Sequence, residues 1–98
     1  MLNNDHKTFE LRRLNGDDIT YMFDRKRSPE GTNGYKRRDQ DYWIVFKPKW
    51  GWVAWSDSYG ITGRPWYVAP EEQADFPPEG EWVSKKGPKS YVYQLTYL

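Results

Sequence analysis

Apolar side chains are densest between residues 42 and 59, which read YWIVFKPKWGWVAWSDSY. They fill both halves of this stretch, and residues 48–51 (PKWG) between them have the composition of a turn. The pattern predicts a β-hairpin whose strands place Phe46 opposite Trp52. A strand pair with one solvated face alternates apolar and polar residues, and this pair does not. We therefore expect either two buried faces or one exposed aromatic face that binds something.

This register divides the predicted hairpin into two faces of different composition. One face carries the cross-strand pairs Trp43–Trp55 and Val45–Val53, and no polar residue interrupts it. The other face carries the pairs Phe46–Trp52, Ile44–Ala54 and Tyr42–Ser56. We expect the first face to belong to the core. The second face ends in a polar residue and adjoins the lysine-rich turn, so an exposed platform is predicted on the Trp52 face.

A first hairpin is predicted near the N-terminus. Residues 7–14 and 19–23 alternate apolar and polar positions, and an Asn-Gly-Asp-Asp segment at 15–18 separates them. Such alternation is typical of half-buried strands, and this turn composition is typical of a hairpin. A two-residue loop would pair Leu11 with Thr20 and so place apolar and polar residues on the same face of the hairpin. A three-residue loop keeps the faces consistent and gives the pairs Phe9–Phe23 and Leu11–Tyr21.

A third hairpin is predicted at the C-terminal end. Residues 81–85 and 90–97 flank a Lys-Gly-Pro-Lys turn at 86–89. The second strand alternates strictly, and one of its sides consists of Tyr91, Tyr93, Leu95 and Tyr97. No stretch long enough for a packed helix shows helical periodicity. We predict an all-β fold, a small antiparallel meander of three hairpins that curls into a barrel or sandwich.

The segment from 24 to 41, DRKRSPEGTNGYKRRDQD, is the least hydrophobic part of the chain. Pro29, Gly31 and Gly34 interrupt regular structure, and Tyr35 is its only large apolar residue. We expect a long charged loop. In a small domain such a loop is either solvated and disordered or part of the functional surface.

The stretch after the central hairpin is predicted to be mostly irregular. Residues 60–65 (GITGRP) have turn composition, and residues 66–68 (WYV) suit a short edge strand limited by flanking prolines. Residues 70–76 can close one helical turn, because a proline stands at the first position and two glutamates lie near the positive end. The proline pair that follows ends this turn.

The chain has 98 residues, which suits one domain with a single small core. We predict a disordered N-terminus at residues 1–6 and one all-β domain at residues 7–98. Only 37% of the residues are hydrophobic, but 18% are aromatic, and each ring can bury about 150–250 Å². A few large rings are therefore expected to replace the many leucines of an ordinary core.

The chain contains no cysteine, which excludes disulfides and thiolate metal sites. The N-terminal residues are too polar for a signal peptide, and no apolar run is long enough to span a membrane. We expect a soluble protein with no membrane partner. The absence of cysteine slightly favours the cytoplasm.

The net charge of +1 conceals an uneven distribution of charged residues. Residues 12–38 contain eight basic and four acidic side chains, a balance of +4, whereas residues 39–83 contain three basic and eight acidic, a balance of −5. A nucleic-acid-binding domain usually has a larger positive excess. The pattern predicts a basic patch beside an acidic one.

The residue types that carry common catalytic and metal chemistry are sparse. The only histidine, His6, lies in the predicted disordered terminus, which argues against a catalytic triad. The paired carboxylates, such as Glu71 and Glu72, lie in predicted turns with no sign of burial. The glycines form no phosphate-binding loop, and no calcium-loop spacing is present. We expect no catalysis, no metal and no cofactor.

Short aromatic and turn motifs follow one another along residues 15–83. They are Asn15-Gly16…Tyr21, Asn33-Gly34-Tyr35, Asp41-Tyr42-Trp43…Gly51-Trp52, Trp66-Tyr67 and Pro77-Pro78-Glu79-Gly80-Glu81-Trp82. Their order resembles a small tryptophan- and tyrosine-rich module that occurs as an accessory domain in many multidomain eukaryotic proteins. The resemblance implies a non-catalytic accessory domain and transfers no ligand or functional residue to this chain.

Aromatic rings and cations are the remaining candidates for recognition. Flat rings can stack on sugars or bases, and together with cations they can bind peptides. The residues predicted to contact a ligand are Trp50, Trp52, Trp66, Tyr59, Tyr35, Arg37 and Arg38.

Three functions fit these residues. The first is a non-enzymatic interaction domain that binds a protein or peptide through an aromatic face rimmed by charged loops, because interfaces enrich aromatic residues and arginine. A homodimer through the same face is a variant of it. The alternatives are a carbohydrate-binding module on the same tryptophan platform and a single-stranded nucleic-acid binder that uses the basic segment 25–38.

Overall fold

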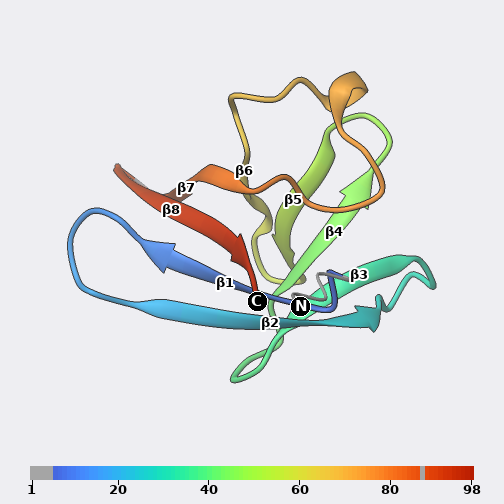
Figure 1. Ribbon diagram of the computed structural model, residues 1–98, viewed down its shortest axis with the longest axis horizontal. Coiled ribbons are helices and arrows are strands. Elements are labelled where there is room, and N and C mark those ends of the chain that lie inside the picture. The colour runs from blue at the N-terminus through green and yellow to red at the C-terminus, as the bar shows by residue number, and fades with distance from the viewer. Residues whose placement is uncertain (1–5, 87) are drawn as a thin grey trace.

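The structure, a computed structural model, describes residues 6–86 and 88–98. Its eight strands are β1 (Thr8–Arg13), β2 (Thr20–Arg27), β3 (Asn33–Arg37), β4 (Trp43–Lys47), β5 (Gly51–Ser56), β6 (Gly60–Arg64), β7 (Gly80–Lys86) and β8 (Lys89–Tyr97). Each strand pairs antiparallel with the next, and β1 also pairs with β8, so the sheet closes into a barrel (Figure 1). The predicted all-β meander that curls into a barrel is confirmed.

The registers of the first and central hairpins agree with the predicted ones. Phe9 lies opposite Phe23 in β1 and β2, and Phe46 lies opposite Trp52 in β4 and β5. The β4–β5 turn closes with Gly51 opposite Lys47, and Gly51 has a φ of 77°. A glycine is favoured here because other residues adopt positive φ at a cost.

The predicted loop at 24–41 is wrong, because most of this segment forms the β2–β3 hairpin. Its tight turn is closed by Ser28 and Thr32, which are joined by backbone and side-chain hydrogen bonds. The charged residues mostly lie on the outside of the barrel, so the strands can form despite their polarity. Tyr35 points inward and is 2% exposed.

The stretch from 60 to 80 also differs from the prediction. Residues 60–64 form β6 rather than a turn, and residues 66–68 form a turn rather than a strand. Gly63 explains the first difference, because a Cβ there would lie 3.1 Å from the carbonyl oxygen of Val83 on β7. A side chain at position 63 would require its neighbours on β7 to shift by a few tenths of an ångström, so glycine favours this close approach of β6 and β7. The predicted helical turn is confirmed as the 3₁₀ helix η1 (Pro70–Glu72).

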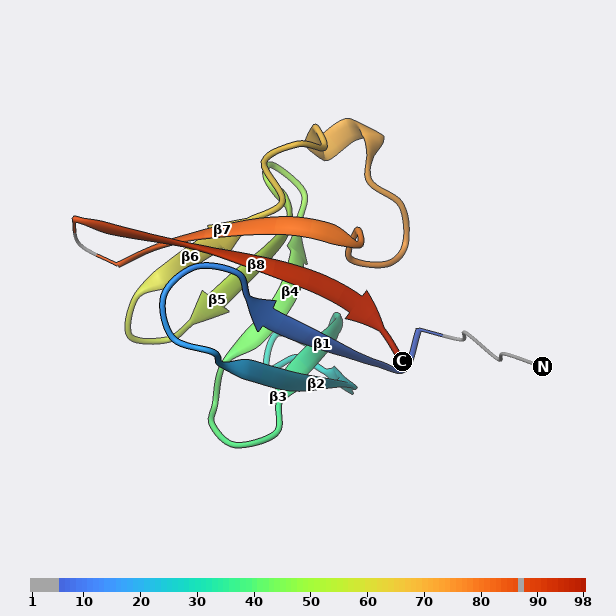
Figure 2. The same ribbon diagram turned by 60° about the vertical axis from the view of Figure 1, so that its left-hand side comes forward.

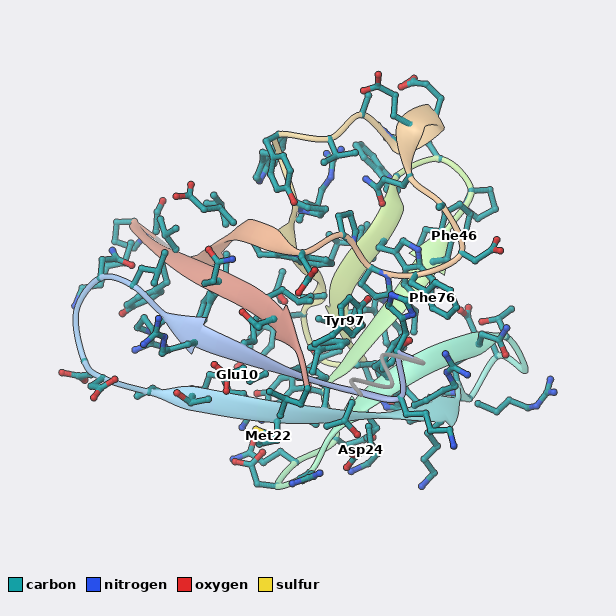
Figure 3. The ribbon with its side chains drawn as sticks, in the orientation of Figure 1. Glu10, Met22, Asp24, Phe46, Phe76 and Tyr97 are labelled. Atoms are coloured by element: carbon teal, nitrogen blue, oxygen red, sulfur yellow. The ribbon has the colours of Figure 1, made fainter. Side chains whose placement is uncertain are left out.

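Within the described residues, no helix is long and apolar enough to cross a membrane. Residues 1–5 of the predicted disordered terminus lie outside the described part of the chain. His6 is described, and its ring stacks on Phe76 with centroids 4.2 Å apart and meets the edge of Tyr97 at 4.5 Å. The labels of Figure 3 show where these two partners lie. The structure thus places His6 in contact with two rings of the domain.

An up-and-down barrel places successive turns at alternate ends. One end, here called the capped end, holds the turns at 28–32 and 48–50 together with the long segment 65–79. The segment 65–79 lies beside the β4–β5 turn in both ribbon views (Figures 1 and 2). The opposite end, here called the open end, holds the β1–β2, β3–β4, β5–β6 and β7–β8 turns.

The main core fills the barrel interior with large rings. It consists of Phe9, Leu11, Phe23, Tyr35, Ile44, Trp52, Trp82, Tyr93 and Leu95. The segment 65–79 supplies acceptors for the indole N–H groups of two of these rings. Trp52 Nε1 donates to the carbonyl oxygen of Ala74 at 3.1 Å, and Trp82 Nε1 donates to that of Pro78 at 2.9 Å. The hydroxyl of Tyr97 donates to the carbonyl of Pro77, and burial raises the pKa of that hydroxyl.

A second apolar cluster covers the opposite face of the central hairpin, outside the barrel. Trp43, Val45 and Val53 are buried in it, and the half-buried Trp55 packs against them. Trp43 Nε1 donates to Asp41 at 2.8 Å, and the ammonium group of Lys47 lies 5.2 Å from the ring centre of Trp55. Both faces of the hairpin are therefore covered, which is the first of the two expected arrangements.

Candidate functional site

Two of the seven predicted ligand-binding residues belong to the core. Trp52 is 3% exposed and Tyr35 is 2% exposed, and both point into the barrel. Tyr35 donates its hydroxyl proton to the carbonyl of His6, so both polar ring atoms have partners inside the protein. The predicted exposed Trp52 platform is wrong, and neither side chain is placed to contact a ligand at the surface.

Two other predicted residues, Trp50 and Trp66, meet at the capped end around an arginine. The guanidinium carbon of Arg64 lies 4.9 Å from the ring centre of Trp50 and 4.3 Å from that of Trp66. The ammonium group of Lys49 lies 5.4 Å from the Trp50 ring. We call Trp50, Arg64 and Trp66 the ring–cation stack. Trp50 is 38% exposed and Trp66 is 60% exposed, and Tyr67 next to them is also exposed.

The segments that carry the stack are fixed by Gln73. Its Oε1 accepts the backbone N–H of Trp52 at 2.8 Å, and its Nε2 donates to the carbonyl oxygen of Val68 at 3.2 Å. One side chain thus joins the strand that follows Trp50 to the turn that contains Trp66. The buried Pro65 between Arg64 and Trp66 fixes the backbone φ there. The stack is therefore held on ordered backbone.

The side chain of Arg64 has no hydrogen bond or ion pair with any residue in the described ranges 6–86 and 88–98. Its Nε is buried without a partner, whereas its terminal nitrogens are neither bonded nor buried. A guanidinium group carries five N–H donors, so those at the tip remain available to an incoming acceptor. Contact with the two indole rings holds the cation in place while the donors at its tip are not fully buried.

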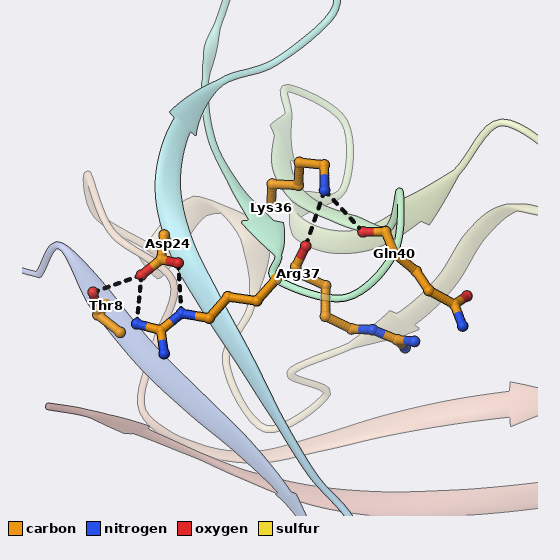
Figure 4. Close-up of polar contacts among 6 residues, drawn as sticks. Thr8, Asp24, Lys36, Arg37 and Gln40 are labelled. Carbon is orange, nitrogen blue, oxygen red and sulfur yellow. Dashed lines mark hydrogen bonds and ion pairs between the residues drawn. The ribbon is translucent and has the colours of Figure 1, made fainter.

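Several cations of the basic segment are bound by acceptors in their own surroundings. Arg38 donates to both carboxylate oxygens of Asp24, at 2.7 and 3.0 Å, and this contact lowers the pKa of Asp24 (Figure 4). Lys36 donates to the carbonyl oxygens of Arg37 and Gln40 (Figure 4). The predicted site residue Arg38 is therefore part of a surface ion pair and not of the ring–cation stack.

The last two predicted residues, Arg37 and Tyr59, line a pocket of about 500 Å³ at the open end. The guanidinium carbon of Arg37 lies between the rings of Tyr21 and Tyr42, 4.1 and 4.6 Å from their centres. Its Nε donates to Asp39 at 2.6 Å. Tyr59 lies at the rim and is 74% exposed. The predicted set is thus divided between the core and three separate parts of the surface.

Sequence reasoning missed Arg64, because residues 60–65 were interpreted as a simple turn. A useful signal was present in the Arg64-Pro65-Trp66 run, which places a cation and a ring on either side of a stiff residue. No cluster of three or more histidine, cysteine, aspartate or glutamate side chains suited to a metal occurs among the described residues.

In comparisons with family models, with curated proteins and with solved structures, no match to this chain was found.

Proposed function

We propose that this protein is a non-catalytic interaction domain that binds a protein or peptide partner through the ring–cation stack. The observation that carries the proposal is the environment of Arg64. This cation is held between Trp50 and Trp66 and lacks an anionic partner within the described residues. The resemblance to an accessory module fits the same role.

The residue types at the stack support a protein partner. Tryptophan, tyrosine and arginine are the residues most enriched in binding hot spots, because they combine large apolar area with directed polar groups. Here Trp66 and Tyr67 are exposed beside Arg64 on one rigid turn. A pre-organised arginine loses less side-chain entropy on binding than a free one.

The partner group that suits Arg64 is a carboxylate. A guanidinium tip binds a carboxylate through paired N–H donors, and flanking indole rings reduce competition from water. The exposed faces of Trp66 and Tyr67 suit an apolar or aromatic side chain next to that carboxylate. We therefore assign the site to a peptide segment in which an acidic residue adjoins an apolar one.

The surroundings of the stack favour a single anionic group over a polyanion. The exposed glutamates Glu71 and Glu72 of η1 lie on the same end of the barrel, next to the start of β5. Their charge would repel a row of phosphates. The cations of the basic segment are also engaged by local acceptors, as at Arg38 and Lys36. A nucleic-acid partner therefore has less support than a peptide.

A phage-displayed random peptide library tests the proposal directly. Selection on the wild-type protein should enrich peptides that pair Asp or Glu with Trp, Phe or Leu. Arg64→Ala and Trp66→Ala should each weaken binding of an enriched peptide by about tenfold or more, the loss expected at a hot spot. Arg64→Lys keeps the charge but loses the planar stack, so it should bind more weakly than wild type.

Arg38→Ala is the matched control, because Arg38 is an exposed arginine whose partner is Asp24 and not a ring. It should bind an enriched peptide like wild type. Enriched peptides without acidic residues, or unchanged affinity in Trp66→Ala, would contradict the proposal. A different outcome would identify a second copy of the chain as the partner. In that case no peptide is enriched, the wild-type protein self-associates in sedimentation experiments, and Trp66→Ala abolishes the self-association.

A further inference from the structure

The pocket at the open end arises from a row of small residues on three neighbouring strands. Ala54 on β5 lies opposite Gly63 on β6, and Gly63 lies opposite Ser84 on β7. Cross-strand partners share a face of the sheet, and Ala54 packs against the interior core. Two residues earlier, the same faces of β5 and β7 carry Trp52 and Trp82. The barrel is therefore filled at one end and hollow at the other.

Large rings form much of the rest of this pocket. Its lining includes the partly buried Tyr21 and Tyr42 and the buried Phe23, Trp82 and Tyr93. The backbone N–H of Arg37 donates to the carbonyl oxygen of Tyr42, which holds the guanidinium and the Tyr42 ring together. A volume of about 500 Å³ is within the range of small-ligand sites, and barrel mouths are a common location for them.

Several hydroxyl groups of the pocket lining have hydrogen-bonding capacity to spare. The side-chain hydroxyls of Ser84, Tyr21 and Tyr42 form no hydrogen bond with any described residue, and none is an isolated buried atom. The hydroxyl of Tyr93 accepts from Arg13 at 2.7 Å, so its own proton is free to donate. A purely apolar ligand would leave these groups without water and without a partner, which is costly.

The charge of the pocket is close to balanced. Among the described residues that line it, Arg37 is the only charged one, and Asp39 pairs with the Arg37 guanidinium at 2.6 Å. This contact also lowers the pKa of Asp39. A phosphate or carboxylate ligand would have to compete with Asp39 for the guanidinium. Electrostatic complementarity therefore favours a neutral ligand.

We infer that this pocket binds one neutral sugar ring, at a site separate from the ring–cation stack. A pyranose has apolar C–H faces that suit the tyrosine rings and a rim of hydroxyls that suits the free donors and acceptors. The small residues at positions 54, 63 and 84 leave room in the pocket for the sugar ring. This assignment uses no residue of the stack, so it does not depend on the peptide-binding proposal.

A titration of the isotopically labelled protein with methyl glycosides, monitored by NMR, tests this inference. The panel contains the methyl glycosides of glucose, galactose, mannose and N-acetylglucosamine. At least one should cause saturable shifts of the Ser84 and Tyr42 amide signals. Ala54→Leu fills the space beside Gly63 and should weaken binding by about tenfold or more, a loss of about 1.4 kcal/mol. Trp66→Ala should bind the sugar like wild type.

Ala54→Leu places a larger side chain in the barrel wall, so Tyr42→Phe serves as the gentler variant. It removes one hydroxyl at the pocket and should weaken sugar binding by about two- to tenfold, the usual range for one neutral hydrogen bond. The inference fails if no methyl glycoside shifts these signals or if a folded Ala54→Leu protein binds as well as wild type. It also fails if glucuronate, AMP or indole, included as charged and aromatic comparators, binds more tightly than every neutral sugar.

Discussion

At the capped end of the barrel, the indole N–H of Trp52 donates to the carbonyl oxygen of Ala74 over 3.1 Å. This bond links the central hairpin to the segment 65–79. It also explains why Trp52 is buried, because burial of an indole ring costs little when its single N–H donor has a hydrogen-bond acceptor. The same arrangement recurs at Trp82 and Pro78. The segment 65–79 is therefore a structural cap for the barrel.

Trp52→Ala should destabilise the protein by about 3–5 kcal/mol, the usual cost of emptying an aromatic core site. Trp52→Phe keeps most of the ring but leaves the Ala74 carbonyl without its donor, and should cost about 1–3 kcal/mol. Urea unfolding monitored by circular dichroism measures both. Trp66→Ala is the control and should cost less than about 1 kcal/mol, since Trp66 is exposed. Equal losses at Trp52 and Trp66 would contradict this account of the cap.

The sequence was sufficient to predict the first and central hairpins, because alternation and turn composition are local features of the chain. Alternation and turn composition predicted the Phe9–Phe23 and Phe46–Trp52 registers before any long-range contact was known. The β2–β3 hairpin was missed because its outward positions are almost all charged, and the only inward signal was Tyr35. Local composition there resembles that of a loop, and only pairing with the neighbouring strands makes it regular.

The candidate site was harder to predict, because exposure depends on contacts between distant segments. No local pattern shows that Ala74 supplies an acceptor for Trp52, so the choice of the exposed face was wrong. The stack brings together residues 50, 64 and 66, and the pocket requires Ala54, Gly63 and Ser84 to align across three strands. Of the predicted rings, Trp50, Trp66 and Tyr59 are exposed, and their role in binding stays a prediction.

Gly51 and Gly16 offer a matched pair of substitutions in two turns. Both have positive φ, 77° and 81°, so alanine should introduce backbone strain of about 1–2 kcal/mol at either position. At Gly16 a Cβ would meet nothing within 4 Å, whereas at Gly51 it would lie 2.7 Å from Gln73 Oε1. Gly51→Ala should therefore cost more, because Gln73 must move and its bond to Trp52 weakens. Thermal unfolding measures the difference, and equal costs would show that Gln73 moves freely.

The folded protein should lose stability at acidic pH, because Asp24 becomes protonated. Hydrogen bonds from Arg38 and from the Thr8 hydroxyl hold the folded-state pKa of Asp24 below its ordinary value of 3.8. A lowered pKa means that the carboxylate stabilises the fold fully above the unfolded-state value, and that this stabilisation is lost as pH falls through the folded-state value. Asp24→Asn should therefore lower the free energy of unfolding at neutral pH. It should also make that free energy fall less steeply with pH below about pH 5.

Urea unfolding at a series of pH values between about 2 and 7 measures this effect. Arg38→Ala should flatten the same part of the curve, because it removes the main contact that lowers the Asp24 pKa. Both groups are substantially exposed, so salt should reduce the effect. An Asp24→Asn protein whose stability declines in acid as steeply as wild type would exclude this role for Asp24.

Quenching of tryptophan fluorescence by acrylamide should report the ring–cation stack separately from the core. Trp43, Trp52 and Trp82 are buried, whereas Trp50 and Trp66 are exposed. Trp66→Phe should therefore reduce the quenchable fraction of the emission, and Trp52→Phe should leave that fraction nearly unchanged or slightly raised. Arg64→Ala should increase quenching, because its removal uncovers one face of each ring that the guanidinium now covers. If Arg64→Ala changes nothing, the guanidinium does not shield the two indoles in solution, and the pre-organised cation on which peptide binding is proposed to depend is absent.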